Sequence, residues 1–123
     1  MAGRPKSIEE VPGWVDSCIK GHKVCVFSKS HCPYCTKAVD LLRKANAKDM
    51  HVEEIESNPF MNEIQDYLQK KTGARSVPRV FIGGEFIGGC DDTARCFSDG
   101  TLMRKLQEAE NFDVKDVSSV ERC

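Results

Sequence analysis

The 123-residue sequence predicts an α/β domain in which a four-stranded mixed sheet carries helices on both faces. Short apolar runs of strand length alternate along the chain with segments whose apolar residues recur at helical spacing. Further on, Gly83-Gly84 joins two short strands and has the composition of a two-residue hairpin turn. A β-α-β unit followed by a hairpin contains both parallel and antiparallel strand pairs, which makes the sheet mixed.

The first predicted elements are a helix and a buried strand. Ser7 and Glu10 have the spacing of a capping box, and Pro12 indicates that the helix begins there or just before it. Gly21 ends this helix. The run from Lys23 to Ser28 is apolar enough to form a central strand.

The middle of the chain predicts a helix, an edge strand and a second helix. Apolar residues between Thr36 and Ala45 recur at a spacing that fits one buried helical face. His51 to Ile55 has mixed polarity, which predicts an edge strand. Asn58-Pro59 is typical of the cap and first position of a helix, and Gly73 ends that helix.

The remaining sequence predicts two strands, two helices and a tail. The strands and helices are expected at Arg79–Ile82, Glu85–Ile87, Asp91 (or Asp92) to Phe97, and Leu102–Ala109, with Asp99-Gly100 between the helices. From Glu110 onward the sequence is polar and aperiodic. We therefore expect one domain over residues 1–109 and a poorly ordered tail over residues 110–123.

Composition excludes several classes of protein. The formal net charge of −1 gives no electrostatic basis for binding nucleic acid or an anionic membrane. No apolar run is long enough to span a bilayer, and the first residues lack the apolar segment of a signal peptide. Seven cysteines is an odd number, so at least one cannot pair within the chain. We expect a reducing, cytoplasmic location and a monomer.

Two cysteines lie where the predicted central strand passes into a helix. If Pro33 is the first helical residue, Cys32 is the N-cap and its sulfur faces unpaired N–H groups and the positive end of the helix dipole. That environment favours the nucleophilic thiolate, and Lys29 can add positive charge. Cys35 lies one turn later, close enough for a disulfide. The pattern predicts a redox pair in which exposed Cys32 attacks and more buried Cys35 resolves.

Three other interpretations of this pair are a structural disulfide, a zinc half-site and two buried cysteines. A zinc site of this type needs a second pair at similar spacing. The remaining cysteines and the histidines do not provide it: Cys18, Cys25, Cys90, Cys96, Cys123, His22, His31 and His51. We therefore expect no metal. Of these cysteines, Cys18, Cys25 and Cys96 are predicted to lie in the core, Cys90 to be buried beside the site, and Cys123 to be exposed.

Cys32-Pro33-Tyr34-Cys35 resembles the active-site motif of dithiol glutaredoxins, whereas thioredoxins have Cys-Gly-Pro-Cys there. The stretches Thr72 to Gly83 and Ile87 to Asp92 also resemble that family, in the same order. The similarity covers about Val15 to Leu106. Ser76 departs from the family pattern, which has Thr, but it keeps the hydroxyl.

The resemblance implies a thioredoxin-like fold with strand order 2-1-3-4 and a binding groove for glutathione. It implies that Val77-Pro78 is cis, and that the Val77 backbone pairs with glutathione as with a short strand. The residues it assigns to glutathione are Lys29, Tyr34, Gln69, Val77, Pro78, Asp91 and Asp92, with Arg75 a weaker candidate. Lys29 and Gln69 would bind the glycine carboxylate. Asp91 would supply its backbone N–H to the γ-glutamyl carboxylate, and Asp92 its side chain to the ammonium, although an Asp at a helix start also serves as a plain cap.

The function implied is glutathione-dependent thiol–disulfide exchange. Cys32 would take glutathione from glutathionylated proteins, and Cys35 would resolve mixed disulfides formed with disulfide-containing proteins. Glutathione is then a co-substrate. Two other interpretations remain open: an iron–sulfur carrier that shares a cluster across a dimer, and a redox-sensing module without turnover.

Overall fold

The computed structural model describes residues 4–112 and contains a four-stranded sheet in the order β2-β1-β3-β4. The strands are β1 (Val24–Ser28), β2 (Met50–Glu54), β3 (Arg79–Ile82) and β4 (Glu85–Gly88). The helices are α1 (Val11–Lys20), α2 (Pro33–Lys44), α3 (Met61–Thr72), α4 (Cys90–Asp99) and α5 (Thr101–Ala109). β1 pairs in parallel with β2 and antiparallel with β3, so the mixed sheet and its predicted order are confirmed.

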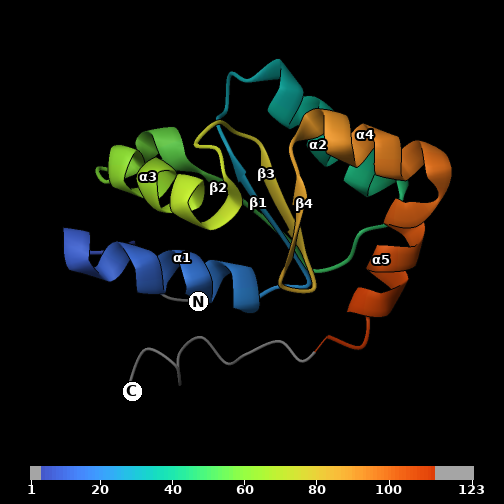
Figure 1. Ribbon diagram of the computed structural model, residues 1–123, viewed down its shortest axis with the longest axis horizontal. Helices are drawn as coiled ribbons and strands as arrows, with labels where there is room; N and C mark the ends of the chain where they lie inside the picture. Colours follow the sequence, from blue (N-terminus) through green and yellow to red (C-terminus); the bar gives the residue numbers. More distant parts are fainter. Residues whose placement is uncertain (1–3, 113–123) are drawn as a thin grey trace.

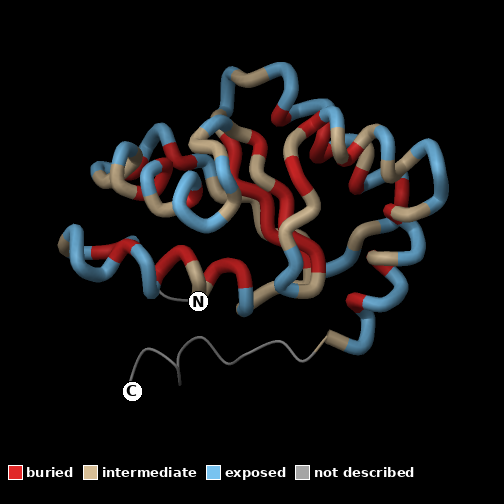
Figure 2. Tube along the Cα trace, viewed as in Figure 1, coloured by how far each residue is buried: buried red, intermediate tan, exposed pale blue. Residues whose placement is uncertain are grey.

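The sheet separates two apolar cores (Figures 1 and 2). On one face, Val15 of α1 and Leu68 of α3 pack with Phe27 and Phe81 of the sheet. On the other face, α2 and α5 pack against the alternate residues of the same strands. All five residues of β1 are buried because this strand has a strand on each side and helices on both faces. The prediction of a central first strand and an edge second strand is therefore confirmed.

The N-terminal cap differs from the prediction. The Ser7 side chain makes no capping hydrogen bond, and a 3₁₀ turn over Ile8–Glu10 precedes α1. The Glu10 carboxylate instead accepts the backbone N–H of Lys6 at 2.8 Å. Glu10, the predicted partner in the capping box, thus does accept a hydrogen bond, but from Lys6 rather than from Ser7.

The start of α3 also differs. Asn58 does not cap the helix directly, because its side-chain oxygen accepts the Phe60 N–H at 2.9 Å and so forms a local turn around Pro59. The helix begins at Met61, two residues later than the sequence pattern predicts. Its end agrees with the prediction, since Gly73 adopts φ +95°, a conformation that favours glycine.

The C-terminal half agrees closely with the pattern. Gly83 and Gly84 have φ values of +58° and +80°, as the predicted hairpin turn requires. The helix predicted to begin at Asp91 or Asp92 begins one residue earlier, at Cys90. Phe112 packs against the α2/α5 core, while positions 113–123 of the predicted tail, with Cys123, lie outside the described residues. Within residues 4–112, no helix combines the length and the apolar character that crossing a membrane requires.

Candidate active site

The two cysteines of the predicted redox pair lie at the start of α2, directly after the loop that follows β1. Pro33 is the first helical residue and Cys32 is the N-cap, with extended backbone at φ −109° and ψ 109°. The Cys32 N–H donates to the Lys29 carbonyl at 3.3 Å, which closes the loop between strand and helix. The buried end of β1 and the first turn of α2 therefore fix the position of the Cys32 sulfur.

Cys35 lies beneath Cys32 and is only 1% exposed, whereas Cys32 is partly exposed. The Cys35 N–H donates to Cys32 Sγ at 3.3 Å. Burial, followed by the hydrogen bond to Cys32, raises the pKa of the Cys35 thiol to about 11. At neutral pH the pair thus presents an accessible sulfur above a protonated, buried thiol.

The chain at Val77 lies against the attacking sulfur. The Val77–Pro78 peptide bond is cis, as the resemblance implied, and the Val77 carbonyl oxygen is 4.0 Å from Cys32 Sγ. In residues 4–112 the Val77 N–H has no hydrogen-bond partner. The structure therefore places an unpaired backbone donor beside Cys32.

The start of α4 is built around Asp92. Gly89 is the N-cap, and its N–H donates to the Asp92 carboxylate at 3.2 Å. Asp92 also pairs with Arg95 one turn later. Gly88 has φ +135°, and a Cβ there would lie 2.2 Å from Asp92 Oδ2, so glycine is required if the carboxylate is to reach the cap. Asp92 therefore performs the capping role that the sequence had left open.

Most of the other side chains that the resemblance assigns to glutathione are exposed. The Tyr34 side chain is 66% exposed, and Gln69 and Asp91 are also exposed. The Lys29 ammonium makes no ion pair within residues 4–112. The structure thus brings Cys32, Cys35 and Val77 into contact, while Tyr34, Gln69 and Asp91 are exposed to solvent.

The weaker candidate Arg75 forms an ion pair with Asp66, and its carbonyl accepts the Gln65 side chain at 2.9 Å. Both contacts tie the loop after α3 to that helix.

Arg79 is a residue of the site that the sequence pattern identified only as the first residue of a strand. Its Nε donates to the Pro78 carbonyl at 3.2 Å, and its guanidinium lies 5.2 Å from the Phe86 ring centroid. Burial lowers the pKa of Arg79, and the nearby Asp92 charge opposes that effect. The available signal was a cation placed directly after Pro78 at the start of a strand.

A second missed feature anchors the loop before Cys32. The Ser30 N–H donates to the Glu56 carboxylate at 2.9 Å, and the Ser30 hydroxyl donates to the same oxygen. These hydrogen bonds, the hydroxyl one first, lower the pKa of Glu56. No short-range pattern identifies this pair, because the two residues are 26 positions apart.

Within residues 4–112, the other cysteines follow the predictions with one exception. Cys18 and Cys25 are fully buried, and Cys90 is buried beside the site, where burial raises the pKa of its thiol. Cys96 is only partly buried at the edge of the α2/α5 core, so its assignment to the core was wrong. It lies on a helix whose buried residues are Cys90 and Thr93.

Comparison with known proteins gives consistent matches. The model of the family described as Glutaredoxin matches residues 24–87. Glutaredoxin-1 of Sus scrofa is 47% identical over 97 residues, which cover 77% of this chain and 92% of that protein. Glutaredoxin-1 of Homo sapiens is 44% identical over the same shares of the two chains.

Solved structures agree with this assignment. Oxidized glutaredoxin 2 from Chlamydomonas reinhardtii superposes with a TM-score of 0.78 at 44% identity, over 85% of this chain and 97% of the other. A buckwheat glutaredoxin–glutathione complex gives a TM-score of 0.79 at 31% identity, over 86% and 96% of the two chains. With the strand order and the Cys32/Cys35 geometry, these matches show that the chain belongs to the glutaredoxin family and is a glutathione-dependent thiol–disulfide oxidoreductase.

Proposed function

We propose that this enzyme removes glutathione from glutathionylated proteins by a monothiol route and reduces protein disulfides by a dithiol route. The observation that carries the proposal is the arrangement of an accessible Cys32 sulfur directly above the buried Cys35 thiol. Only the first of the two is available to attack a large substrate. The second becomes available only to a sulfur already bonded to Cys32.

In the monothiol route, the Cys32 thiolate attacks the glutathione sulfur of the mixed disulfide. The protein thiolate leaves, and Cys32 becomes glutathionylated. A second glutathione thiolate then attacks that adduct, which releases oxidised glutathione and restores the Cys32 thiolate. For a protein disulfide, Cys35 loses its proton and attacks the Cys32 mixed disulfide, so that the substrate leaves fully reduced and Cys32–Cys35 is formed. Two glutathione molecules reduce that disulfide.

Glutathione is proposed to bind along Val77 and the start of α4. The Val77 N–H, which lacks a partner in residues 4–112, supports pairing with the extended tripeptide beside Cys32. The Asp91 N–H lies in the first turn of α4, where no carbonyl within the helix can accept it, so it suits the γ-glutamyl carboxylate. Asp92 is proposed to bind the ammonium while keeping its cap, and Lys29, Tyr34, Gln69 and Pro78 to complete the groove.

Protein substrates are proposed to dock on the exposed face of α2. A surface groove of about 440 Å³ follows this helix from the residue after Cys32, lined by Pro33, Thr36, Lys37, Asp40, Leu41 and Lys44. Exposed Tyr34 lies at the same helix start. We further propose that the protein acts as a monomer in the cytoplasm, a reducing compartment in which the Cys32/Cys35 pair would be returned to its dithiol form.

Two single substitutions test both routes. Cys32→Ser should abolish glutathione removal and disulfide reduction, because a serine hydroxyl is not ionised at neutral pH. Cys35→Ser should keep the first activity and lose most of the second. Both are measured with glutathione, glutathione reductase and NADPH, on a glutathionylated peptide and on a protein disulfide. If Cys35→Ser loses glutathione removal as completely as Cys32→Ser, glutathione is not the resolving thiol. The proposed glutathione groove along Val77 and the start of α4 then has no basis.

A further inference from the structure

Three metal-ligating side chains meet on the face of the sheet that α1 covers, on a different part of the molecule from the redox pair. Cys18 comes from α1, and His51 and Glu53 come from β2. Their ligand atoms, one from each residue, all lie within 4.8 Å of one another. The local spacing of cysteines and histidines could not reveal this cluster, because the fold brings its members together from distant parts of the chain.

A second thiol lies next to the cluster. Cys25 of β1 is the register partner of His51 on the neighbouring parallel strand, so the two side chains leave the same face of the sheet. Cys18 and Cys25 are both fully buried. A second buried thiol therefore lies beside the three ligating side chains.

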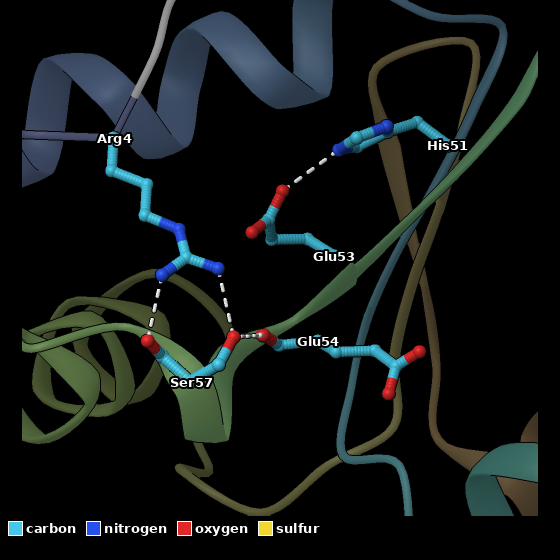
Figure 3. A network of polar contacts seen from close by, with 5 residues as sticks. All are labelled: Arg4, His51, Glu53, Glu54 and Ser57. Carbon is cyan, nitrogen blue, oxygen red and sulfur yellow. Dashed lines mark hydrogen bonds and ion pairs between the residues drawn. The ribbon is translucent and has the colours of Figure 1, made fainter.

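Within residues 4–112, no lysine or arginine side chain neutralises the Glu53 carboxylate. The Glu53 side chain is 13% exposed and forms no ion pair with a lysine or arginine there. It instead accepts a 2.9 Å hydrogen bond from His51 Nε2, whose side chain is 25% exposed (Figure 3). Arg4, drawn in the same view, donates hydrogen bonds from both terminal guanidinium nitrogens to Ser57, at 2.7 and 2.8 Å, and forms no ion pair with Glu53.

The imidazole of His51 is also held in position. The His22 ring stacks on it with centroids 4.8 Å apart and an interplanar angle of 11°. His22 is itself fixed by the Asp49 carboxylate, 2.9 Å from Nδ1. The His51 ring plane is thus set by a neighbour that does not compete for Nε2.

We propose that Cys18 Sγ, His51 Nε2 and the Glu53 carboxylate bind one Zn²⁺ ion. Thiolate, imidazole and carboxylate are the ligand types that zinc accepts, at about 2.0–2.3 Å in tetrahedral geometry. Bound ligand atoms then lie roughly 3.3–3.8 Å apart, so the cluster needs to contract by about 1 Å. Binding releases the Cys18 thiol proton, the ring proton of His51 moves from Nε2 to Nδ1 so that Nε2 can bind the ion, and a water molecule takes the fourth position.

This site departs from the expectation of no metal, which depended on sequence spacing alone. Magnesium and calcium are excluded as occupants because both prefer oxygen ligands. A bound zinc ion would link α1 to the edge strand β2 and leave the redox pair untouched.

The test is a titration of the full chain in a Cys32→Ser/Cys35→Ser background, which removes the competing thiols of the redox pair. Co²⁺ serves as the spectroscopic probe, followed by displacement with Zn²⁺. We expect one equivalent of Co²⁺ to produce a thiolate-to-cobalt charge-transfer band and the strong visible bands of a tetrahedral site, and one equivalent of Zn²⁺ to abolish them. If no charge-transfer band appears, the proposal is wrong.

Single substitutions in the same background locate the ion. Cys18→Ala should eliminate the charge-transfer band, and Glu53→Gln, which keeps the side-chain shape, should weaken Co²⁺ affinity at least tenfold. Cys96→Ala and Glu54→Gln are the matched controls and should leave binding unchanged. Circular dichroism of the metal-free variants checks that each is folded. A band that survives Cys18→Ala, or an affinity unchanged in Glu53→Gln, would overturn the proposal, and the second variant decides even if the first does not fold.

Discussion

The backbone N–H of Cys35 donates to the sulfur of Cys32 across 3.3 Å, so the two residues of the redox pair are joined before any disulfide forms. The resolving residue thereby orients the attacking sulfur with its main chain, and its own thiol stays buried below. One residue thus has two separable roles. A side-chain substitution at Cys35 removes the thiol and keeps the N–H, which is why Cys35→Ser is informative.

The raised pKa of Cys35 predicts a loss of stability at alkaline pH. The folded thiol has a pKa of about 11, above the ordinary value of about 8.5, so the unfolded chain releases this proton first. The stabilisation is complete below pH ~8.5 and is lost as pH rises through about 11, by up to ~3 kcal/mol. Urea unfolding of the reduced enzyme at several alkaline pH values measures it.

Cys35→Ser is the control for that experiment. Other groups with raised pKa values, such as Tyr67 at about 12, titrate in both proteins and cancel in the difference. The variant should lose less stability between neutral and alkaline pH than the wild-type enzyme. Equal losses would mean that Cys35 is not the group that titrates.

Gly88→Ala should destabilise the protein by about 2–4 kcal/mol, because the new Cβ would meet Asp92 at 2.2 Å in a backbone conformation that disfavours L side chains. Gly73→Ala is the matched control. Gly73 also has positive φ, +95°, but no atom lies within 4 Å of the added Cβ, so only about 1 kcal/mol should be lost. Thermal or urea unfolding compares them, and similar losses would contradict the packing argument.

Asp92→Asn separates the helix cap from the proposed contact with glutathione. Asparagine keeps an oxygen for the Gly89 N–H but loses the charge that would bind the ammonium. Stability should change little, while kcat/KM for a glutathionylated peptide should fall roughly ten- to a hundredfold, as expected for a lost charge-assisted hydrogen bond of about 1.5–3 kcal/mol. Unchanged kinetics would leave Asp92 as a cap alone.

Ser30→Ala should raise the pKa of Glu56 towards its usual value. The Ser30 hydroxyl is the largest cause of the lowered pKa, and the Ser30 N–H, which the variant keeps, is the second. With a lowered folded pKa, the stabilisation is present above the ordinary pKa and is lost as pH falls through the lowered value. An NMR titration of the Glu56 carboxyl measures the change. A pKa that stays equally low would assign the effect to another group.

Prediction from sequence succeeded where the signal was local. The apolar run before Ser28, the Gly83-Gly84 turn and Pro33 at a helix start each depend on a few adjacent residues, and all three were confirmed. It failed at α3, where Asn58 satisfied the Phe60 N–H in a turn before the helix rather than serving as its cap. Two local solutions were available to the same residues, and propensity alone did not choose between them.

The active site shows the same difference between features that a local sequence signal predicts and features that it does not. The Cys32 and Cys35 positions follow from one motif, and the confirmed cis bond before Pro78 follows from the resemblance. The contacts of Arg79 with Pro78 and Phe86, and of Ser30 with Glu56, depend on tertiary packing. No periodicity encodes such pairs, because each partner alone is an ordinary polar or aromatic residue.

The antiparallel register of β1 and β3 places Ile82 opposite Val24, so the Gly83-Gly84 turn lies at the end of the sheet away from Ser28 and the cysteines that follow it (Figure 1). The hairpin turn and the redox pair therefore lie at opposite ends of the sheet. A dye, an electrode linker or an affinity handle attached at exposed Glu85 would hold the protein at the hairpin end, with the reactive thiol facing the solution. The enzyme is therefore a suitable oriented component for a thiol biosensor.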